Sequence, residues 1–374
     1  MARLVINGSA PLKGVVRLGG AKNSSFKLMV AALLCAGETR LLNFSRIAEV
    51  ALVEAMIKAL GGKVREAGER TLFINAKELL SSTLPESLGA ASRASTMLIA
   101  PLLARTGKAI VPLPGGDKIG VRPLERHFEG LKAMGVSLEV KNNHVFASTA
   151  GLTGTTYRFA KNSHTGTETM IMAAVLASGE TVLENAALEP EVDDLIELLS
   201  AMGARIKRLP DRQIKITGVN VLKPVIHKVM PDRNEAVSYA IAAAVTGGDV
   251  IVENAKREHL EAFLEKFSEA GAGYELGDYG IRFFSKKTLA AVDITTAPHP
   301  GFMTDWGPLW TILSTQSIGV SKIVETVFTQ RFQYVSDLKT MGAKIDWFDP
   351  KPKNPEEFYN FNLSDDKPEY HRLN

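Results

Sequence analysis

Apolar and polar positions follow one pattern five times along this chain. Each copy has a short apolar run typical of a strand, then an acidic or polar turn, and then apolar residues at helical spacing. Each helical segment ends at a glycine, and the successive glycines are 74, 68, 68 and 71 residues apart by subtraction of their positions. These glycines are Gly61, Gly135, Gly203, Gly271 and Gly342. A period of this length predicts a protein built from repeated units.

The third copy shows why each segment has its character. Residues 182–186 predict a strand that leaves the core at a polar turn, and residues 189–193 open a helix with a proline and acidic side chains at its N-terminal end. Apolar side chains then recur on one helical face as far as Met202. Gly203 supplies the left-handed residue that ends the helix, and residues 204–208 alternate as the next strand.

A second class of helix lies between these segments. Five stretches are apolar on nearly all sides, which predicts buried helices. They span residues 26–36, 94–104, 169–177, 237–245 and 308–315. We therefore predict an α/β fold in which helices lie inside and sheets surround them. We also predict a linker at residues 221–229 and a proline-rich, charged loop at residues 349–357.

The period places a sixth unit near residue ~412, whereas the sequence given ends at Asn374. We therefore expect five of six units in this chain. Absence of the sixth unit would leave apolar surface on the fourth and fifth units exposed.

Composition adds limits to this picture. A length of 374 residues predicts two domains, and 45% hydrophobic with 23% charged residues is typical of a soluble globular protein. The net charge of +3 does not favour a nucleic acid partner. The single cysteine, Cys35, lies in an apolar segment and fits the core of a protein in a reducing compartment. The N-terminus does not resemble a signal peptide and no apolar stretch approaches the ~20 residues of a membrane span, so we predict a cytoplasmic protein with no membrane partner.

The residue types also exclude several kinds of chemistry. The seven histidines and the one cysteine have no metal-ligand spacing. The glycine motifs that bind dinucleotides, or that end in Gly-Lys-Ser/Thr and bind phosphates, are missing from the sequence. We predict neither a metal nor a cofactor.

Two segments that precede apolar helices combine polar residues with glycine. Lys22 and Asn23 follow Gly19 and Gly20, and this arrangement predicts an anion site or, alternatively, a helix cap with a solvated lysine. Residues 162–169, which include His164, Thr165 and Gly166, repeat it. They predict a second ligand-facing helix start or a capping box of Thr165 with Glu168.

A third segment, residues 112–123, contains three glycines and three prolines. It predicts either a mobile lid that carries Asp117 and Arg122, or a surface turn.

The C-terminal half offers three further candidates. Asp232 beside Arg233 could bind a ligand, although an ion pair that braces the helix start is favoured by the residue types. Asp305, held in a turn before an apolar helix, could act as a general base or as a helix cap. Arg331 lies between aromatic residues and could clamp a phosphate or lie on the surface.

In this order and on this repeat, the motifs resemble those of the UDP-N-acetylglucosamine 1-carboxyvinyltransferase family of enolpyruvyl transferases, from Leu4 to about Lys344. The resemblance rests on Gly20-Ala21-Lys22-Asn23, Arg93-Ala94-Ser95, Leu113-Pro114-Gly115-Gly116-Asp117-Lys118-Ile119-Gly120, Arg122-Pro123, Glu189-Pro190-Glu191, Met230-Pro231-Asp232-Arg233, Pro298-His299-Pro300 with Thr304-Asp305, and Phe328 with Arg331-Phe332.

The resemblance implies a two-domain fold, in which each domain is an inside-out α/β barrel of three repeated units. One domain would be residues 22–229 with the lid at 112–123. The other would combine residues 1–21 with 230–374 and lack its last unit.

The implied reaction transfers the enolpyruvyl group of phosphoenolpyruvate to the 3′-hydroxyl of UDP-N-acetylglucosamine and releases phosphate, which starts peptidoglycan precursor synthesis. By resemblance, Lys22, Asp117 and Asp305 are catalytic: Asp305 takes the hydroxyl proton and Asp117 helps to protonate the methylene carbon. The resemblance assigns substrate binding to Asn23, Arg93, Arg122, Pro123, Leu124, His164, Thr165, Gly166, Asp232, Val327, Phe328 and Arg331. It implies small-molecule substrates only and a monomer.

The chain departs from the family pattern at two places. Most members carry cysteine where this chain has Asp117, so we expect an active acid and resistance to fosfomycin, whose epoxide the lid thiolate opens. The arginines of the family's last unit have no counterpart here.

Two alternatives stay open. A 5-enolpyruvylshikimate-3-phosphate synthase would have Lys-Ser in place of Lys22-Asn23. A relative that binds the UDP-sugar without turnover would fit the lack of the last arginines.

Overall fold

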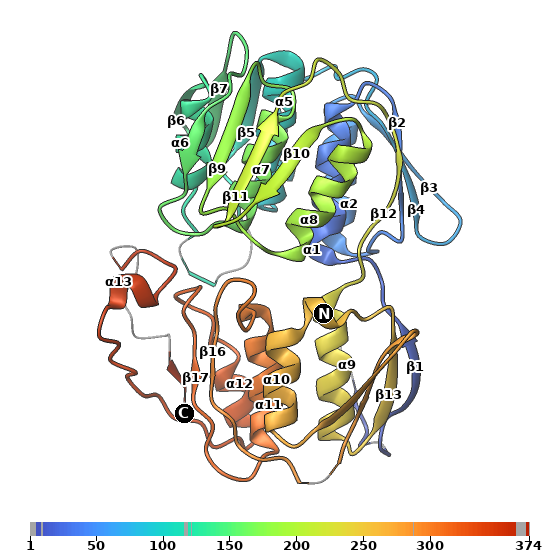
Figure 1. Ribbon diagram of the computed structural model, residues 1–374, viewed down its shortest axis with the longest axis vertical. Helices are drawn as coiled ribbons and strands as arrows, with labels where there is room; N and C mark the ends of the chain where they lie inside the picture. Colours follow the sequence, from blue (N-terminus) through green and yellow to red (C-terminus); the bar gives the residue numbers. More distant parts are fainter. Residues whose placement is uncertain are drawn as a thin grey trace. The chain divides into compact units, whose positions relative to one another are not determined.

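The computed structural model describes residues 5–8, 10–115, 119–120, 122–286, 288–363 and 372–373, and the chain forms two compact units (Figure 1). The larger unit comprises Gly19–Lys118 and Arg122–Met230. The smaller unit comprises Met1–Leu18, Ile119–Val121 and Pro231–Asn374. Each unit has its own hydrophobic core.

The larger unit contains three copies of one strand–helix–hairpin pattern, and each copy forms a separate small sheet. The first sheet has the order β12-β2-β4-β3, the second β5-β7-β6 and the third β10-β11-β9-β8. The strands are β2 (Glu38–Leu42), β3 (Lys63–Ala67), β4 (Thr71–Asn75), β5 (Lys108–Pro112), β6 (Ser137–Lys141), β7 (His144–Ser148), β8 (Thr156–Arg158), β9 (Glu180–Glu184), β10 (Arg205–Leu209), β11 (Gln213–Thr217) and β12 (Ile226–Lys228).

Helices fill the space between these sheets (Figure 1). They are α1 (Lys22–Ala31), η1 (Ala32–Leu34), α2 (Ala48–Ala59), α3 (Glu86–Gly89), α4 (Ala94–Met97), α5 (Ile99–Thr106), α6 (Glu125–Ala133), α7 (His164–Ala174) and α8 (Pro190–Ala201). Every residue of α1 from Ser24 to Ala31 is buried, and so is every residue of α7 from Gly166 to Ala174. Helices without a polar face are thus inside, as the sequence predicts for these segments.

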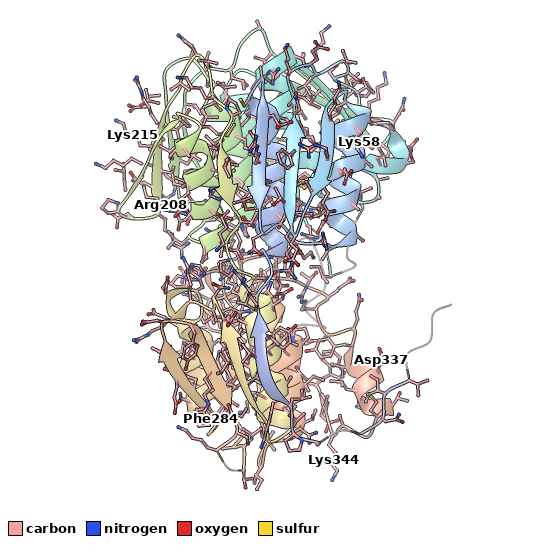
Figure 2. The ribbon with its side chains drawn as sticks, turned by 90° about the vertical axis from the view of Figure 1, so that its right-hand side faces the viewer. Lys58, Arg208, Lys215, Phe284, Asp337 and Lys344 are labelled. Atoms are coloured by element: carbon pink, nitrogen blue, oxygen red, sulfur yellow. The ribbon has the colours of Figure 1, made fainter. Side chains whose placement is uncertain are left out.

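The hairpins have the alternation that a sheet with one buried face requires. In β4, Leu72 and Ile74 are buried while their neighbours are partly exposed. On β11, Lys215 points away from its sheet (Figure 2) and its ammonium lies 2.8 Å from Glu180. Each sheet therefore buries one face against the helices and presents the other to solvent.

The helix-ending glycines behave as predicted. All five have positive φ, between 85° and 104°. In the third copy, Gly203 N donates to Ser200 O at 2.9 Å and Ala204 N donates to Leu199 O at 2.9 Å, which satisfies the last carbonyls of the helix.

The smaller unit contains the fourth copy of the pattern and part of a fifth. Its sheets have the orders β1-β13-β15-β14 and β16-β17-β18. The strands are β1 (Lys13–Arg17), β13 (Asp249–Glu253), β14 (Gly273–Gly277), β15 (Gly280–Phe284), β16 (Ile294–Thr295), β17 (Ile323–Val324) and β18 (Arg372–Leu373). The helices are α9 (Arg233–Val245), η2 (Arg257–His259), α10 (Glu261–Glu269), η3 (Thr304–Trp306), α11 (Gly307–Thr315), α12 (Val335–Thr340) and α13 (Pro355–Phe358).

Strand β1, from the start of the sequence, completes the first of these sheets. It pairs in parallel with β13, with Lys13 opposite Asp249. The core behind this sheet is aromatic: Phe263 lies within 6.5 Å, centroid to centroid, of Phe267, Phe283, Phe302, Trp306 and Trp310. The start of the sequence therefore folds with its second half.

Three expectations need correction. Helices α9 and α11 are buried on one face only, since Tyr239 is 38% exposed and Ile312 is 37% exposed. The predicted linker at residues 221–229 contains a strand, β12, which pairs in parallel with β2 and places Ile226 opposite Arg40. The predicted loop at residues 349–357 contains the start of α13, where Pro355 occupies the first helical turn that proline favours.

Cys35 is buried and unpaired, as expected, and burial raises the pKa of its thiol. Every helix in the described ranges is too short or too polar to span a membrane.

Candidate active site

The start of α1 carries the first candidate group. Ala21 N donates to Met230 O at 2.8 Å, and Ser25 N donates back to Ala21 O, so the segment before the helix is fixed at both ends. Lys22 and Asn23 are the first residues of the helix, and Lys22 keeps 47% of its side chain exposed. Burial of the rest of α1 thus leaves these two side chains at an accessible helix N-terminus.

Glu49, which the sequence analysis does not single out, connects Lys22 with the segment that carries Arg93. Its Oε2 lies 3.7 Å from Lys22 Nζ, and its Oε1 accepts a hydrogen bond of 2.8 Å from Ser92 Oγ. The carboxylate therefore holds the starts of α1 and α4 to the first turn of α2. No local sequence pattern marks this role, because it depends on three segments that meet only in the folded unit.

Arg93 and Arg122 form a second cationic part of the larger unit. Arg93 Nη1 donates to the Arg122 carbonyl at 2.9 Å. Burial, together with the charge of the neighbouring Arg122, lowers the pKa of Arg93 to about 10, while Glu125 opposes the shift. The guanidinium is still charged at neutral pH. Two arginines held together in this way favour an anion between or beside them.

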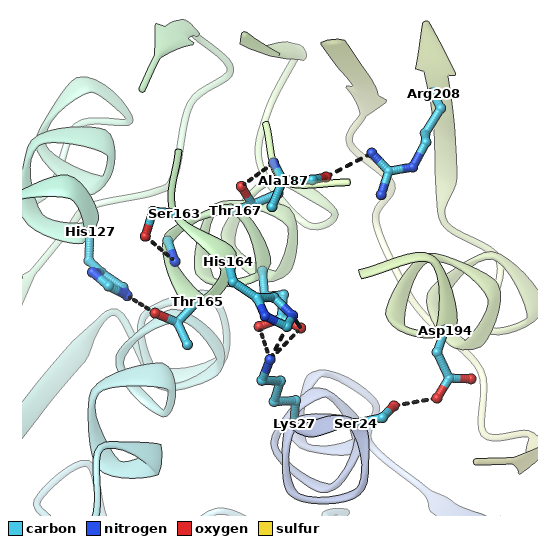
Figure 3. A network of polar contacts seen from close by, with 12 residues as sticks. Ser24, Lys27, His127, Ser163, His164, Thr165, Thr167, Ala187, Asp194 and Arg208 are labelled. Carbon is cyan, nitrogen blue, oxygen red and sulfur yellow. Dashed lines mark hydrogen bonds and ion pairs between the residues drawn. The ribbon is translucent and has the colours of Figure 1, made fainter. Parts of the chain in front are cut away.

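The N-terminus of α7 is capped by Ser163, not by Thr165 as the capping-box alternative supposes. Ser163 Oγ accepts from Gly166 N at 3.2 Å (Figure 3). A Cβ on Gly166 would lie 2.7 Å from that Oγ, so the cap needs glycine here. Glu168 instead contacts Lys27 across the core.

Thr165 is held by a residue that the sequence analysis does not identify. His127 Nε2 lies 3.0 Å from Thr165 Oγ1 (Figure 3). Burial lowers the pKa of His127 to about 3, and the charges of Arg93 and Arg126 add to this effect, so its imidazole is neutral. His127 N also donates to Leu124 O at 2.9 Å, at the start of α6 just after Pro123. His127 therefore joins Leu124 and Thr165.

The segment predicted as a lid is only partly described. Gly115 N donates to Ala90 O at 2.9 Å within the larger unit. Ile119 O accepts from Gln330 N at 3.0 Å, and Gly120, with φ +107°, packs so closely on Thr329 that a Cβ would lie 2.0 Å from its Oγ1. Asp117 lies outside the described residues.

In the smaller unit, Asp305 and Arg331 form an ion pair. The Arg331 guanidinium also lies 5.9 Å from the centre of the Phe328 ring. The pair keeps partial exposure, 31% for the side chain of Asp305 and 15% for that of Arg331. A carboxylate held by an arginine is fixed in one orientation, which is what a general base requires.

Glu325 is a third functional candidate that the sequence analysis missed. Its Oε1 accepts from Val327 N at 2.7 Å and Phe328 N at 3.0 Å, and its Oε2 accepts from Thr304 Oγ1 at 2.7 Å. Burial raises the pKa of this carboxyl, and these three donors oppose the rise. Glu325 thus ties the segment before Arg331 to the residue before Asp305. In the sequence, the only local sign of this role is that an acidic residue comes directly after the buried strand Ile323–Val324.

Asp232 is linked through Asn234 to Trp306, the residue after Asp305. It caps α9, because its Oδ1 accepts from Asn234 N at 2.7 Å and from Glu235 N at 3.2 Å. Asn234 Oδ1 in turn accepts from the indole of Trp306 at 2.9 Å. Asp305 is therefore flanked by two anchored neighbours, Thr304 and Trp306.

The structure thus brings the predicted residues together in two groups, one in each unit. Lys22, Arg93 and Arg122 are linked through Glu49 and Ser92, and Asp305, Phe328 and Arg331 are in contact through Arg331.

Other kinds of site find less support. Among the described residues, no three acidic, histidine or cysteine side chains cluster as metal ligands would. A pocket of about 480 Å³ in the smaller unit is lined by Gln330, Phe332, Gln333, Val335, Ser336, Lys339 and Trp347. None of the predicted site residues lines it.

Two solved structures have the same fold. The enolpyruvyl transferase NikO from Streptomyces tendae matches with a TM-score of 0.82 at 21% identity, over 92% of this chain and 82% of that chain. EPSP synthase from Acinetobacter baumannii matches with a TM-score of 0.70 at 20% identity, over 92% and 81%. The fold is that of the enolpyruvyl transferases, which confirms the predicted fold class.

Sequence similarity establishes the family. The profile of EPSP synthase (3-phosphoshikimate 1-carboxyvinyltransferase) matches residues 6–357. A relative from Dichelobacter nodosus (strain VCS1703A) is 40% identical over 345 residues, or 92% of this chain and 82% of the relative. Another, from Sorangium cellulosum (strain So ce56), is 41% identical over 349 residues, again 92% and 82%. Both are named UDP-N-acetylglucosamine 1-carboxyvinyltransferase. The chain belongs to the EPSP synthase family and is an enzyme of the carboxyvinyltransferase class.

Proposed function

We propose that this enzyme transfers the enolpyruvyl group of phosphoenolpyruvate to the 3′-hydroxyl of UDP-N-acetylglucosamine and releases phosphate. The relatives with this name, at 40% and 41% identity over 92% of the chain, support the substrate. The structural observation that carries the proposal is the Asp305–Arg331 pair, held between two anchored neighbours. The reaction is the first committed step of peptidoglycan precursor synthesis.

The proposed mechanism is addition followed by elimination. The sugar oxygen forms a bond to C2 of phosphoenolpyruvate, Asp305 takes the hydroxyl proton, and Asp117 gives a proton to C3. In the second step the Asp117 carboxylate takes a proton back from C3, the C2–O bond to phosphate breaks with its electron pair on the phosphate, and the C2–C3 double bond forms again. Asn23 holds the sugar hydroxyl. Lys22, Arg93 and Arg122 stabilise the charges of phosphate and carboxylate, and this stabilisation lowers the barrier most where negative charge develops in the transition state.

The remaining predicted residues would bind the nucleotide sugar. In the larger unit these are Pro123, Leu124, His164, Thr165 and Gly166, and in the smaller unit Asp232, Val327, Phe328 and Arg331. The hydrogen bonds of His127 and Glu325 support this role, because they hold the backbone or side chains of these residues in one arrangement.

We also propose that residues 22–229 and residues 1–21 with 230–374 are the two domains, with the lid at 112–123. The protein would act in the cytoplasm as a monomer without a membrane partner. Through peptidoglycan it would affect cell shape and division, and Asp117 would make it resistant to fosfomycin.

The experiment is measurement of phosphate release with both substrates present. Release that requires UDP-N-acetylglucosamine and is lost in Asp305→Asn supports the proposal. Release with shikimate 3-phosphate instead would assign the protein to the EPSP synthase reaction. Binding of the nucleotide sugar by calorimetry without any release would indicate a binding protein.

A further inference from the structure

A buried ion pair joins α1 and α7 in the larger unit. Lys27 Nζ lies 2.9 Å from Glu168 Oε1 and 2.7 Å from Oε2, and the two side chains are 3% and 0% exposed (Figure 3). Neither residue belongs to the proposed set of substrate-binding residues. Both contact one that does, because His164 Nε2 lies 2.9 Å from Lys27 Nζ and 3.2 Å from Glu168 Oε1.

These contacts favour one position for the proton of the imidazole ring. Lys27 can only donate and Glu168 can only accept. When His164 is neutral, the shorter contact of its Nε2 with Lys27, 2.9 Å against 3.2 Å to Glu168, favours an Nε2 that accepts from Lys27 and a proton on Nδ1. When His164 is charged, both nitrogens carry protons and Nε2 donates to Glu168. Nδ1 is therefore a donor in both states.

On balance the surroundings of His164 favour its charged state. Burial and the Lys27 charge lower the pKa of His164, but Glu168 on α7 and Glu189 before α8 oppose them and leave this pKa above its ordinary value. A lone histidine would change its donor pattern as it titrates. Here the pair keeps Nδ1 protonated on both sides of the transition.

The ion pair is a poor candidate for stability alone. Removing two charges from water costs several kcal/mol per ion, and apolar replacements of such pairs are often neutral or stabilising. This buried pair also contacts a partly exposed histidine and can fix the orientation of its ring, which is a role besides stability. The side chain of His164 is 21% exposed, and within the described part of the chain its Nδ1 has no hydrogen-bond partner.

We propose that Lys27 and Glu168 are positioning residues that hold His164 with Nδ1–H as a donor to an acceptor oxygen of the nucleotide sugar. This rests on the proposed function, which places His164 at the binding site. Thr165, the next residue, is held in the same way by His127. Two consecutive side chains at the start of α7 are thus fixed from behind by buried polar residues.

The tautomer of His164 tests the positioning step without any substrate. In protein labelled with ¹⁵N-histidine, long-range ¹H–¹⁵N spectra distinguish the two neutral tautomers, and His164→Asn assigns the signal. We expect the Nδ1–H tautomer above the transition in the wild type and the Nε2–H tautomer in Lys27→Met, where only the Glu168 acceptor remains. An Nε2–H tautomer in the wild type would overturn the proposal.

Binding tests the second step. The double variant Lys27→Met/Glu168→Leu keeps an apolar contact between α1 and α7 and should fold. We expect its Kd and KM for UDP-N-acetylglucosamine to rise about tenfold, the size typical of losing one hydrogen bond to a charged group, with KM for phosphoenolpyruvate unchanged. Combination with His164→Asn should add no further loss.

Arg105→Met is the matched control. Arg105 is a partly buried cation of the same unit that donates to the carbonyls of Leu33 and Ala76. Its loss should reduce stability and leave Kd and KM unchanged. An unchanged Kd in the double variant would contradict the proposal. If the wild type binds no UDP-N-acetylglucosamine, the proposed function fails, while the tautomer measurement still decides whether the pair positions His164.

Discussion

At the scale of single residues, the buried polar groups of this enzyme act mainly through the backbone and side chains of their neighbours. Glu325 accepts from two backbone N–H groups and one hydroxyl, and His127 connects Leu124 with Thr165. Such groups are costly to leave without partners, so each is tied to one local arrangement.

Replacement of Glu325 tests whether such a buried polar group holds the candidate site residues of the smaller unit in place. In Glu325→Leu, the N–H groups of Val327 and Phe328 and the hydroxyl of Thr304 lose their acceptor, so we expect a loss of about 3 kcal/mol in unfolding free energy and a fall in kcat of at least about tenfold. Glu325→Gln can still accept from both N–H groups and should retain most activity. Denaturant unfolding and phosphate release measure the two effects, and equal activity of the two variants would contradict this role.

Titration of His127 gives a pH prediction. Its pKa is about 3 in the folded protein, against an ordinary value of 6.5. Between these values the unfolded chain binds a proton that the folded chain does not, so stability falls as the pH drops from 6.5 towards 3, by up to about 1.4 kcal/mol per pH unit. His127→Gln lacks this dependence. We expect the difference in unfolding free energy between wild type and variant to shift in favour of the variant as the pH is lowered. A difference that stays constant at all pH values in denaturation experiments would contradict the low pKa of His127.

The identity of residue 117 leads to a chemical prediction. A carboxylate is a weaker nucleophile towards an epoxide than a thiolate, so activity of the wild type should persist in fosfomycin. Asp117→Cys should become sensitive, with a covalent adduct visible by mass spectrometry. An adduct on Asp117 itself would contradict the expectation.

At the scale of elements, one carboxylate holds three segments of the larger unit together. Asp194 on α8 accepts from Ser24 on α1 (Figure 3), from Met230 N at 3.2 Å, and pairs with His227 of β12 at 2.7 Å. Its side chain is 4% exposed. The arrangement is not that of a catalytic triad, because the acid lies between the serine and the histidine.

Asp194→Asn should therefore destabilise the larger unit. The amide puts a donor either at Oδ2, which accepts from both Ser24 and Met230, or at Oδ1, which faces His227, and we expect a loss of about 1–3 kcal/mol in unfolding free energy. Asp193→Asn is the control on the same helix: its side chain is 49% exposed and its ion pair with Arg208 lies near the surface, so its removal should change stability by less than about 1 kcal/mol. Similar losses in both variants would contradict the role of Asp194.

At the scale of the whole molecule, two hydrophobic cores support two compact units. Because each core is closed within its own unit, a cavity in one should destabilise that unit first.

Phe263→Ala tests this independence. Phe263 is fully buried among five aromatic rings of the smaller unit, so its truncation should cost about 3–5 kcal/mol. Hydrogen exchange should increase in β13, β15 and α10 and stay unchanged in α1 and α7. Met56→Ala, in the core of the larger unit, should give the opposite distribution. Increased exchange in both units from either variant would show that they unfold together.

The sequence by itself determined the repeated strand–helix–hairpin unit and the largely buried helices α1, α5 and α7, because hydrophobic spacing and helix-ending glycines are local signals. Its motifs also determined the family. Tertiary structure alone decided that β12 joins a sheet, that α9 and α11 bury one face, and that Glu49, Glu325, Lys27 and Glu168 act beside the candidate site residues. These outcomes depend on contacts between segments far apart in the chain, and the energy of a polar group depends on partners that no local pattern specifies.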